Sequence, residues 1–299
     1  MHETPVEFSP VLSELTGATV SLKLENLQVT GSFKARGAFN RLLALAEGER
    51  ARGFITASSG NHGAAVAYAA KKLGIDGIIF VPENVAPLKL ENIRRLGGNV
   101  RIFGVEGGVT EVHARAYANE HGMTYISPYN DPLVIAGQGT IGAEIARQVA
   151  SVDVIVASVG GGGLICGTAG YLKAIRLGRV AIGVSARNSM AMAASVRAGR
   201  IIETEHLPTL SDGTAGGVEP GAITFDLCRE LVDEFVEVSE DEIAAALRLF
   251  IEAHHMLCEG AAAVAVAGML RAKDRLRGKN VVAVICGANI SADQLKVAL

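Results

Sequence analysis

Four consecutive glycines form a candidate ligand-binding loop. Gly160, Gly161, Gly162 and Gly163 follow an apolar run and precede a helical pattern that starts at Leu164. Glycine amides turn inward without interference from a Cβ atom, and a helix N-terminus offers free N–H groups and a positive dipole end. The cluster therefore predicts a phosphate-binding loop. The alternative is a flexible turn, and no Gly-Lys-Ser/Thr follows that would make a Walker loop.

A second segment combines hydroxyls, an amide and an imidazole between a predicted strand and a predicted helix. Its residues are Ser58, Ser59, Gly60, Asn61, His62 and Gly63. Hydroxyl groups and the free N–H groups of a helix N-terminus suit a carboxylate ligand. The alternative is that Ser58 or Ser59 is only the N-cap of the helix.

Lys34 and Cys286 are candidates because of their neighbours. Lys34 stands between Phe33 and Ala35, and burial of a lysine favours the neutral amine, which is a nucleophile. Cys286 follows the strand predicted at residues 281–285, at the end of a strand where ligands bind in open parallel sheets. The alternatives are a surface lysine and a small buried hydrophobic residue.

Residues 137–142 fit the pattern G-x-G-x-x-G of dinucleotide sites. Such a site also needs a preceding strand and an acidic residue about 20 positions later. Asp131-Pro132 precedes the pattern, and residue 162 is glycine. We expect these glycines at a helix N-terminus that packs closely against another element, with an NAD-dependent oxidoreductase as the alternative.

Short apolar runs alternate with alanine-rich helical patterns. Strands are predicted at residues 20–24, 53–56, 77–81, 100–103, 154–159, 180–184 and 281–285. Helices are predicted at residues 63–73, 88–96, 109–120, 142–150, 164–177 and 241–253. Uniformly apolar strands are typical of parallel sheets covered on both faces, and the alternation indicates an α/β fold. We expect a large domain of residues 1–52 and 131–299 and a small mobile domain of residues 53–130, with a linker at residues 122–132.

Composition excludes several classes of protein. The 28 basic and 31 acidic residues give a net charge of −3, which argues against a nucleic-acid partner. The N-terminus lacks a signal-peptide pattern, and no apolar stretch reaches the roughly 20 residues that cross a membrane. The four cysteines are too widely spaced for a secreted disulfide framework. We therefore expect a cytoplasmic enzyme with no membrane partner.

Several segments together resemble the motifs of the threonine/serine dehydratase family. These are pyridoxal-phosphate enzymes of fold type II, the fold of the tryptophan synthase β-subunit. The matching segments, in the family's order, are residues 23–26, 30–38, 58–63, 136–140, 160–163, 259–261 and 286–289. The resemblance covers nearly the whole chain. It implies an α/β protein with two open twisted, mainly parallel sheets flanked by helices.

The resemblance implies pyridoxal 5'-phosphate as the cofactor and gives each segment a role. Lys34 is expected to bind the cofactor covalently and then to take the α-proton of the substrate. Phe33 is expected to pack beside the ring, Asn61 to bond the phenolic oxygen, and Cys286 to face the pyridine nitrogen. The phosphate is assigned to Gly160, Gly161, Gly162, Gly163 and Leu164. The substrate carboxylate is assigned to Ser58, Ser59, Gly60, Asn61 and His62.

The implied reaction is β-elimination of water from a hydroxy amino acid such as L-threonine or L-serine, giving a 2-oxo acid and ammonia. A neutral partner such as Cys286 does not force a proton onto the pyridine nitrogen, and this favours elimination over a long-lived carbanion. Two alternatives share the fold. Ser59 matches the opposite-face base of serine racemases, so it is a second candidate catalytic residue. Residues 183–217 resemble the dehydratases of hydroxyectoine utilisation.

Metal activation is not expected. Metal-activated members of the family carry acidic residues after the strand that matches residues 180–184, whereas residues 185–191 here contain none. We expect a small-molecule amino acid substrate, no metal and a homodimer.

Overall fold

The computed structural model describes residues 1–176 and 178–298 and divides into two compact units. The small unit comprises Lys34–Gly137 together with Met1, and the large unit comprises His2–Phe33 and Gln138–Leu299. The small unit is longer than the domain expected at residues 53–130. Within it, α2 (Lys34–Leu43) packs against α4 (Asn61–Leu73), so the residues around Lys34 belong with the smaller sheet.

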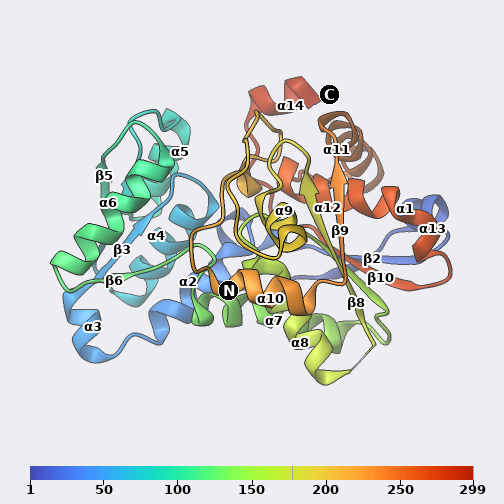
Figure 1. The fold of residues 1–299 in the computed structure, drawn as a ribbon, viewed down its shortest axis with the longest axis horizontal. Coiled ribbons are helices and arrows are strands. Elements are labelled where there is room, and N and C mark those ends of the chain that lie inside the picture. The colour runs from blue at the N-terminus through green and yellow to red at the C-terminus, as the bar shows by residue number, and fades with distance from the viewer. Residues whose placement is uncertain (177, 299) are drawn as a thin grey trace. The chain divides into compact units, whose positions relative to one another are not determined.

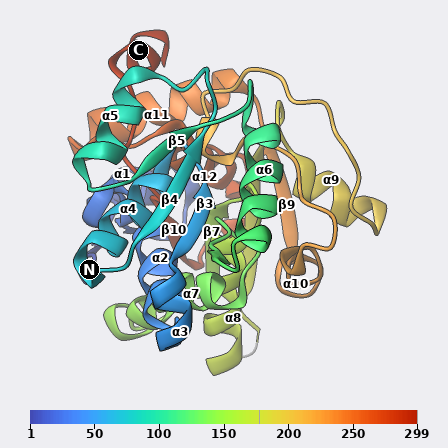
Figure 2. The ribbon, with the colours of Figure 1, turned by 90° about the vertical axis from the view of Figure 1, so that its left-hand side faces the viewer.

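The small unit is built on a four-stranded parallel sheet of order β5-β4-β3-β6. Its elements after α2 are α3 (Glu47–Arg52), β3 (Phe54–Ala57), α4, β4 (Gly77–Val81), α5 (Pro87–Arg95), β5 (Val100–Ile102), α6 (Gly107–Glu120) and β6 (Thr124–Tyr125). The strands lie between α4 and α6 (Figure 2). Ile55, Ile78 and Phe80 of the sheet pack against Ala114 and Ala118 of α6, which fixes this helix on one face.

The large unit is built on a six-stranded sheet of order β1-β2-β10-β7-β8-β9, in which only β1 and β2 pair antiparallel. Its strands are β1 (Val6–Phe8), β2 (Thr19–Lys23), β7 (Val154–Ser158), β8 (Val180–Ala186), β9 (Glu234–Val238) and β10 (Asn280–Val284). Its main helices are α1 (Pro10–Thr16), α8 (Gly163–Ile175), α9 (Ala191–Ala198), α10 (Ile223–Leu231), α11 (Glu240–His254), α12 (Gly260–Arg271), α13 (Lys273–Leu276) and α14 (Ala292–Ala298). Short 3₁₀ turns occur at η1 (Glu25–Leu27), η2 (Val29–Gly31) and η3 (Asp212–Thr214).

Helices cover both faces of the large sheet. In Figure 1, α11 and α12 lie on one side of it and α8 and α10 on the other. This arrangement explains why β7 is buried at every residue and why its sequence is apolar apart from Ser158. Helix α12 is buried from Gly260 to Met269, as expected for a helix that is apolar on all sides.

The predicted α/β fold with two mainly parallel sheets is confirmed. Each predicted strand is present within two residues of its expected bounds. Three further strands, β1, β6 and β9, were not predicted. Strands β1 and β6 have three and two residues, too few to show a pattern, and β9 (Glu-Phe-Val-Glu-Val) is a polar edge strand.

The helix predictions are also close, with one exception. The predicted end of α8 at residue 177 lies outside the described residues. Helix α7 (Pro132–Gln148) begins ten residues before the predicted 142–150 helix, so the glycines of residues 137–142 lie inside it and do not follow a strand directly. A Cβ atom at Gly137 would lie 2.6 Å from Arg36 O, and one at Gly142 would lie 2.7 Å from Thr168 O. These glycines therefore allow close helix packing, and the expectation that they open a helix is wrong.

None of the described helices is long and apolar enough to cross a lipid bilayer.

Gly268 in α12 provides a test of the packing between this helix and the sheet. A Cβ atom there would overlap the Val184 side chain of β8, so Gly268→Ala should lower the free energy of unfolding by about 1–3 kcal/mol. Gly170→Ala is the matched control, because the new Cβ would meet only Leu231 Cδ1 at 3.5 Å. In helix α8 this control should stabilise the protein by up to about 1 kcal/mol. Urea unfolding checks both values, and equal effects of the two substitutions would contradict the described packing.

Candidate functional site

The glycine loop of the large unit joins β7 to α8 and is tightly packed. Gly162 is the N-cap of α8, with a φ of 88° and no side-chain capping bond. A Cβ atom at Gly160 would lie 2.9 Å from Thr214 O, and one at Gly162 would lie 2.9 Å from Cys228 Sγ. Both positions therefore need glycine. The first N–H groups of α8 have no partner within the helix, which leaves them suited to an anion.

Cys286 lies at the end of the neighbouring strand. Because β10 pairs parallel with β7, Cys286 and the glycine loop leave the sheet at the same edge. The Cys286 side chain is buried, and the Ser158 hydroxyl donates to Cys286 Sγ at 3.6 Å. The amide of Phe33 donates to Cys286 O at 3.0 Å, so Phe33 is held beside Cys286.

Lys34 is the first residue of α2 in the small unit and is half-buried. Its Nζ donates to the carbonyl oxygen of Pro128 at 2.8 Å. Pro128 lies in the segment that follows β6, which was expected to be a linker.

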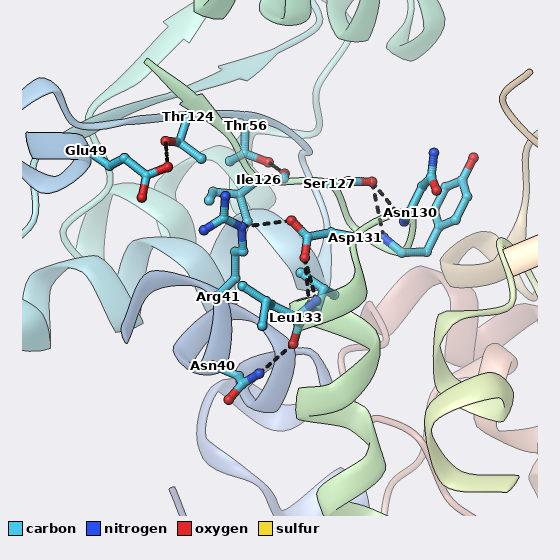
Figure 3. A network of polar contacts seen from close by, with 12 residues as sticks. Asn40, Arg41, Glu49, Thr56, Thr124, Ile126, Ser127, Asn130, Asp131 and Leu133 are labelled. Carbon is cyan, nitrogen blue, oxygen red and sulfur yellow. Dashed lines mark hydrogen bonds and ion pairs between the residues drawn. The ribbon is translucent and has the colours of Figure 1, made fainter. Parts of the chain in front are cut away.

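A polar network holds this segment in place (Figure 3). The Thr56 hydroxyl donates to Ile126 O at 2.8 Å, and the Asn130 backbone amide donates to Ser127 Oγ at 3.0 Å. Further along, the Arg41 guanidinium lies 2.8 Å from Asp131 Oδ2, and both side chains are largely buried. Residues of α2 and β3 thus hold the segment that carries the Pro128 carbonyl group, to which the Lys34 amine donates.

The turn at Ser58–Gly60 leads from β3 into α4. Gly60 is the N-cap of α4 and makes no side-chain capping bond, so neither serine is the N-cap that the sequence allowed as an alternative. The Ser58 Oγ accepts from the Gly60 amide at 3.2 Å, which leaves the Ser58 hydroxyl proton to donate. A Cβ atom at Gly63 would overlap Ser58 O, so this tight turn depends on that glycine. The N-terminus of α4 is therefore suited to a carboxylate.

His62 lies in the first turn of α4 and is buried. Burial and, to a smaller extent, the charge of Lys34 lower its pKa to about 3, although the hydrogen bond with Ile126 O opposes the shift. His62 is therefore neutral near pH 7. Its Nε2 lies 3.1 Å from the Ile126 carbonyl oxygen, an acceptor only, so Nε2 carries the proton. Nδ1 is buried and has no hydrogen-bond partner among the described residues.

Each unit thus brings together part of the predicted set. In the small unit, Lys34 and His62 bond carbonyl groups two residues apart, at Pro128 and Ile126. In the large unit, Phe33 and Cys286 are joined directly. The carbonyl groups of Ile126 and Pro128 could not be predicted from the sequence, because every residue has a backbone carbonyl group whatever its side chain. The role of Ser158 could have been predicted, because it is a polar residue at the end of an otherwise apolar strand.

The chemistry of these groups fits pyridoxal phosphate. The uncapped start of α8 suits the phosphate, the Lys34 amine suits the aldehyde, and the thiol side chain of Cys286 suits the pyridine nitrogen. The uncapped start of α4 suits the carboxylate of an amino acid.

Metal binding and thiol chemistry depend on how the His, Cys, Asp and Glu side chains are grouped and buried. Among the described residues, no three His, Cys, Asp or Glu side chains lie close enough together to hold a metal ion. All four cysteines are buried free thiols. A hydrogen bond with Cys166 and burial raise the pKa of Cys228, and burial raises the pKa of Cys258. These two thiols are therefore protonated near pH 7.

Known proteins resemble the chain over almost its whole length. Residues 1–287 match the family described as pyridoxal-phosphate dependent enzyme. The L-threonine ammonia-lyase of Thermotoga maritima is 43% identical over 295 residues, which are 99% of this chain and 73% of that protein. Among solved structures, the processed threonine deaminase isoform 2 of Solanum lycopersicum has a TM-score of 0.95 at 35% identity, with 99% of this chain and 87% of that chain covered. Serine racemase from Dictyostelium discoideum has a TM-score of 0.90 at 34% identity, with 97% and 94% covered.

The match spans both units and includes the glycine loop, Lys34 and Cys286. The chain therefore belongs to the family of pyridoxal-phosphate dependent enzymes and has their fold type II architecture.

Proposed function

We propose that this enzyme is a dehydratase that eliminates water from L-threonine or L-serine and yields a 2-oxo acid and ammonia. The observation that carries the proposal is the 43% identity, over 99% of the chain, to a protein named L-threonine ammonia-lyase. The threonine deaminase structure with a TM-score of 0.95 supports the same reaction class. The donor groups described above match the needs of such a reaction.

Each group of the cofactor is proposed to have its own partner in the chain. Gly160–Gly163 and Leu164 bind its phosphate through the uncapped start of α8. Lys34 bonds its aldehyde carbon, Asn61 bonds its phenolic oxygen, and Phe33 packs beside its ring. When bound, pyridoxal phosphate supplies the electron sink for the electrons left at the substrate's α-carbon.

The substrate is proposed to be oriented by its carboxylate. Ser58, Ser59, Gly60, Asn61 and His62 surround the start of α4, where hydroxyl and amide donors are available. Neutral His62 adds no charge there, so the backbone amides and hydroxyls carry the recognition. A carboxylate at a helix N-terminus gains on the order of 1 kcal/mol from the helix dipole.

Lys34 is proposed as the base that removes the α-proton. Its Nζ donates a hydrogen bond to the Pro128 carbonyl oxygen, and this bond holds the amine at a defined position before the reaction. Cys286 is proposed as a neutral partner of the pyridine nitrogen, and the Ser158 hydroxyl donates to its sulfur at 3.6 Å. A neutral partner favours prompt loss of the β-hydroxyl over accumulation of a carbanion.

Racemisation is a second candidate function. The serine racemase of Dictyostelium discoideum has a TM-score of 0.90 against this chain, and Ser59 is proposed as the base on the opposite face of the substrate. A dehydratase of hydroxyectoine utilisation is the third candidate and rests on residues 183–217 alone. A homodimer, a cytoplasmic location and independence from metals stay predictions, which sedimentation, fractionation and chelation respectively would test.

The products distinguish these functions. The protein supplied with pyridoxal phosphate should convert L-threonine or L-serine to equal amounts of 2-oxo acid and ammonia. Lys34→Ala should lower kcat on the order of 10³-fold because the α-proton loses its base. Lys296→Ala, on an exposed side chain of α14, should leave kcat unchanged. Formation of the D-amino acid without ammonia would establish the racemase instead, and full activity of Lys34→Ala would contradict both.

The lowered pKa of His62 predicts a pH-dependent stability. The unfolded chain binds a proton at His62 below about pH 6.5, whereas the folded chain does so only near pH 3, so stability falls as the pH falls through this range. From pH 6.5 to pH 5 the loss is about 2 kcal/mol. Urea unfolding of His62→Gln should lack this loss, while His121→Gln, on an exposed side chain, should retain it. Identical pH dependence in the wild type and His62→Gln would show that His62 is not buried as a neutral group.

A further inference from the structure

Glu259 is a buried carboxylate at the start of α12 that does not cap its own helix. Its side chain is 3% exposed, and it makes no side-chain capping bond although it occupies the N-cap position. Removing a carboxylate from water costs several kcal/mol unless other donors replace the water. The contacts of Glu259 with other segments therefore decide what it does.

The first segment that contacts Glu259 carries Cys286. The Glu259 backbone amide donates to Gly287 O at 3.0 Å, and the Asn289 backbone amide donates to Glu259 Oε2 at 3.1 Å. A Cβ atom at Gly287 would lie 2.8 Å from the carboxylate, so only glycine permits this approach. Residues 287–289, directly after Cys286, thus contact the Glu259 carboxylate.

The second segment is the turn η3 at residues 212–214. A Cβ atom at Gly213 would lie 3.2 Å from Glu259 Oε1. The next residue, Thr214, places its carbonyl oxygen 2.9 Å from the Cβ position of Gly160. This turn therefore lies close to both Glu259 and the glycine loop.

We propose that Glu259 is a positioning residue for the cofactor. Its carboxylate holds the segment after Cys286 and the turn at Gly213 in fixed places, and through them it fixes Cys286 and Gly160. This inference rests on the proposed function, which assigns Cys286 to the ring and Gly160 to the phosphate of one cofactor. Glu259 itself does not need to touch the cofactor or the substrate.

The test measures binding of pyridoxal phosphate to apoprotein and the visible circular dichroism of the bound cofactor. Glu259→Ala should raise the dissociation constant about tenfold or more and change the dichroic band, because the ring and phosphate contacts lose their fixed spacing. Glu259→Gln keeps an oxygen that can accept from the Asn289 amide, so its dissociation constant should stay within about threefold of the wild type. Glu242→Ala is the matched control. It removes a carboxylate from the capping box of α11, away from these segments, and should change neither readout.

A double-mutant cycle guards against a general loss of folding. Gly287→Ala places a methyl group against the carboxylate and should weaken cofactor binding as Glu259→Ala does. In the double variant the methyl group occupies the vacated space, so the second substitution should add less than about a threefold further loss. If Glu259→Ala does not fold, Gly287→Ala alone decides the result.

The outcomes separate the inference from the proposed function. Wild-type affinity and dichroism in Glu259→Ala, or in Gly287→Ala, would overturn the positioning role while leaving the function intact. A wild-type protein that binds no pyridoxal phosphate would overturn the proposed function itself.

Discussion

Parallel pairing of neighbouring strands is the constraint on which the arrangement of functional groups depends. In the large unit, β7 pairs with β10, so the glycine loop and Cys286 follow adjacent carboxyl ends. In the small unit, β3 pairs parallel with β6, so the turn at Ser58 and the carbonyl groups of Ile126 and Pro128 also follow adjacent carboxyl ends. Groups that are far apart in the sequence therefore meet at one edge of each sheet.

Close backbone approach is the second requirement, and glycine provides it at the points where segments meet. Gly160 lets Thr214 contact the glycine loop, Gly63 lets the Ser58 turn close, and Gly287 admits the Glu259 carboxylate. At each position a side chain would push two segments apart by more than the packing allows. These three glycines thus permit contacts of the backbone with another backbone group or with a carboxylate.

Much of this could be predicted from the sequence, because the information lay in residue types. Uniformly apolar strands such as β7 showed the parallel sheet, and the four glycines showed the loop before α8. What escaped prediction lay in geometry: the carbonyl groups that accept from Lys34 and His62 have no sequence signature. The G-x-G-x-x-G pattern led to a wrong position for the helix start, because glycines that allow close helix packing cannot be distinguished from glycines at a helix start in a single sequence.

We propose that Lys34 bonds pyridoxal phosphate and that the glycine loop holds its phosphate group. Reduction of the holoprotein with borohydride, followed by peptide mapping, tests it most directly. We expect a yellow protein that loses its visible band on reduction and a single phosphopyridoxyl label on the peptide containing Lys34. A label on another lysine, or a colourless protein that takes up no pyridoxal phosphate, would contradict it.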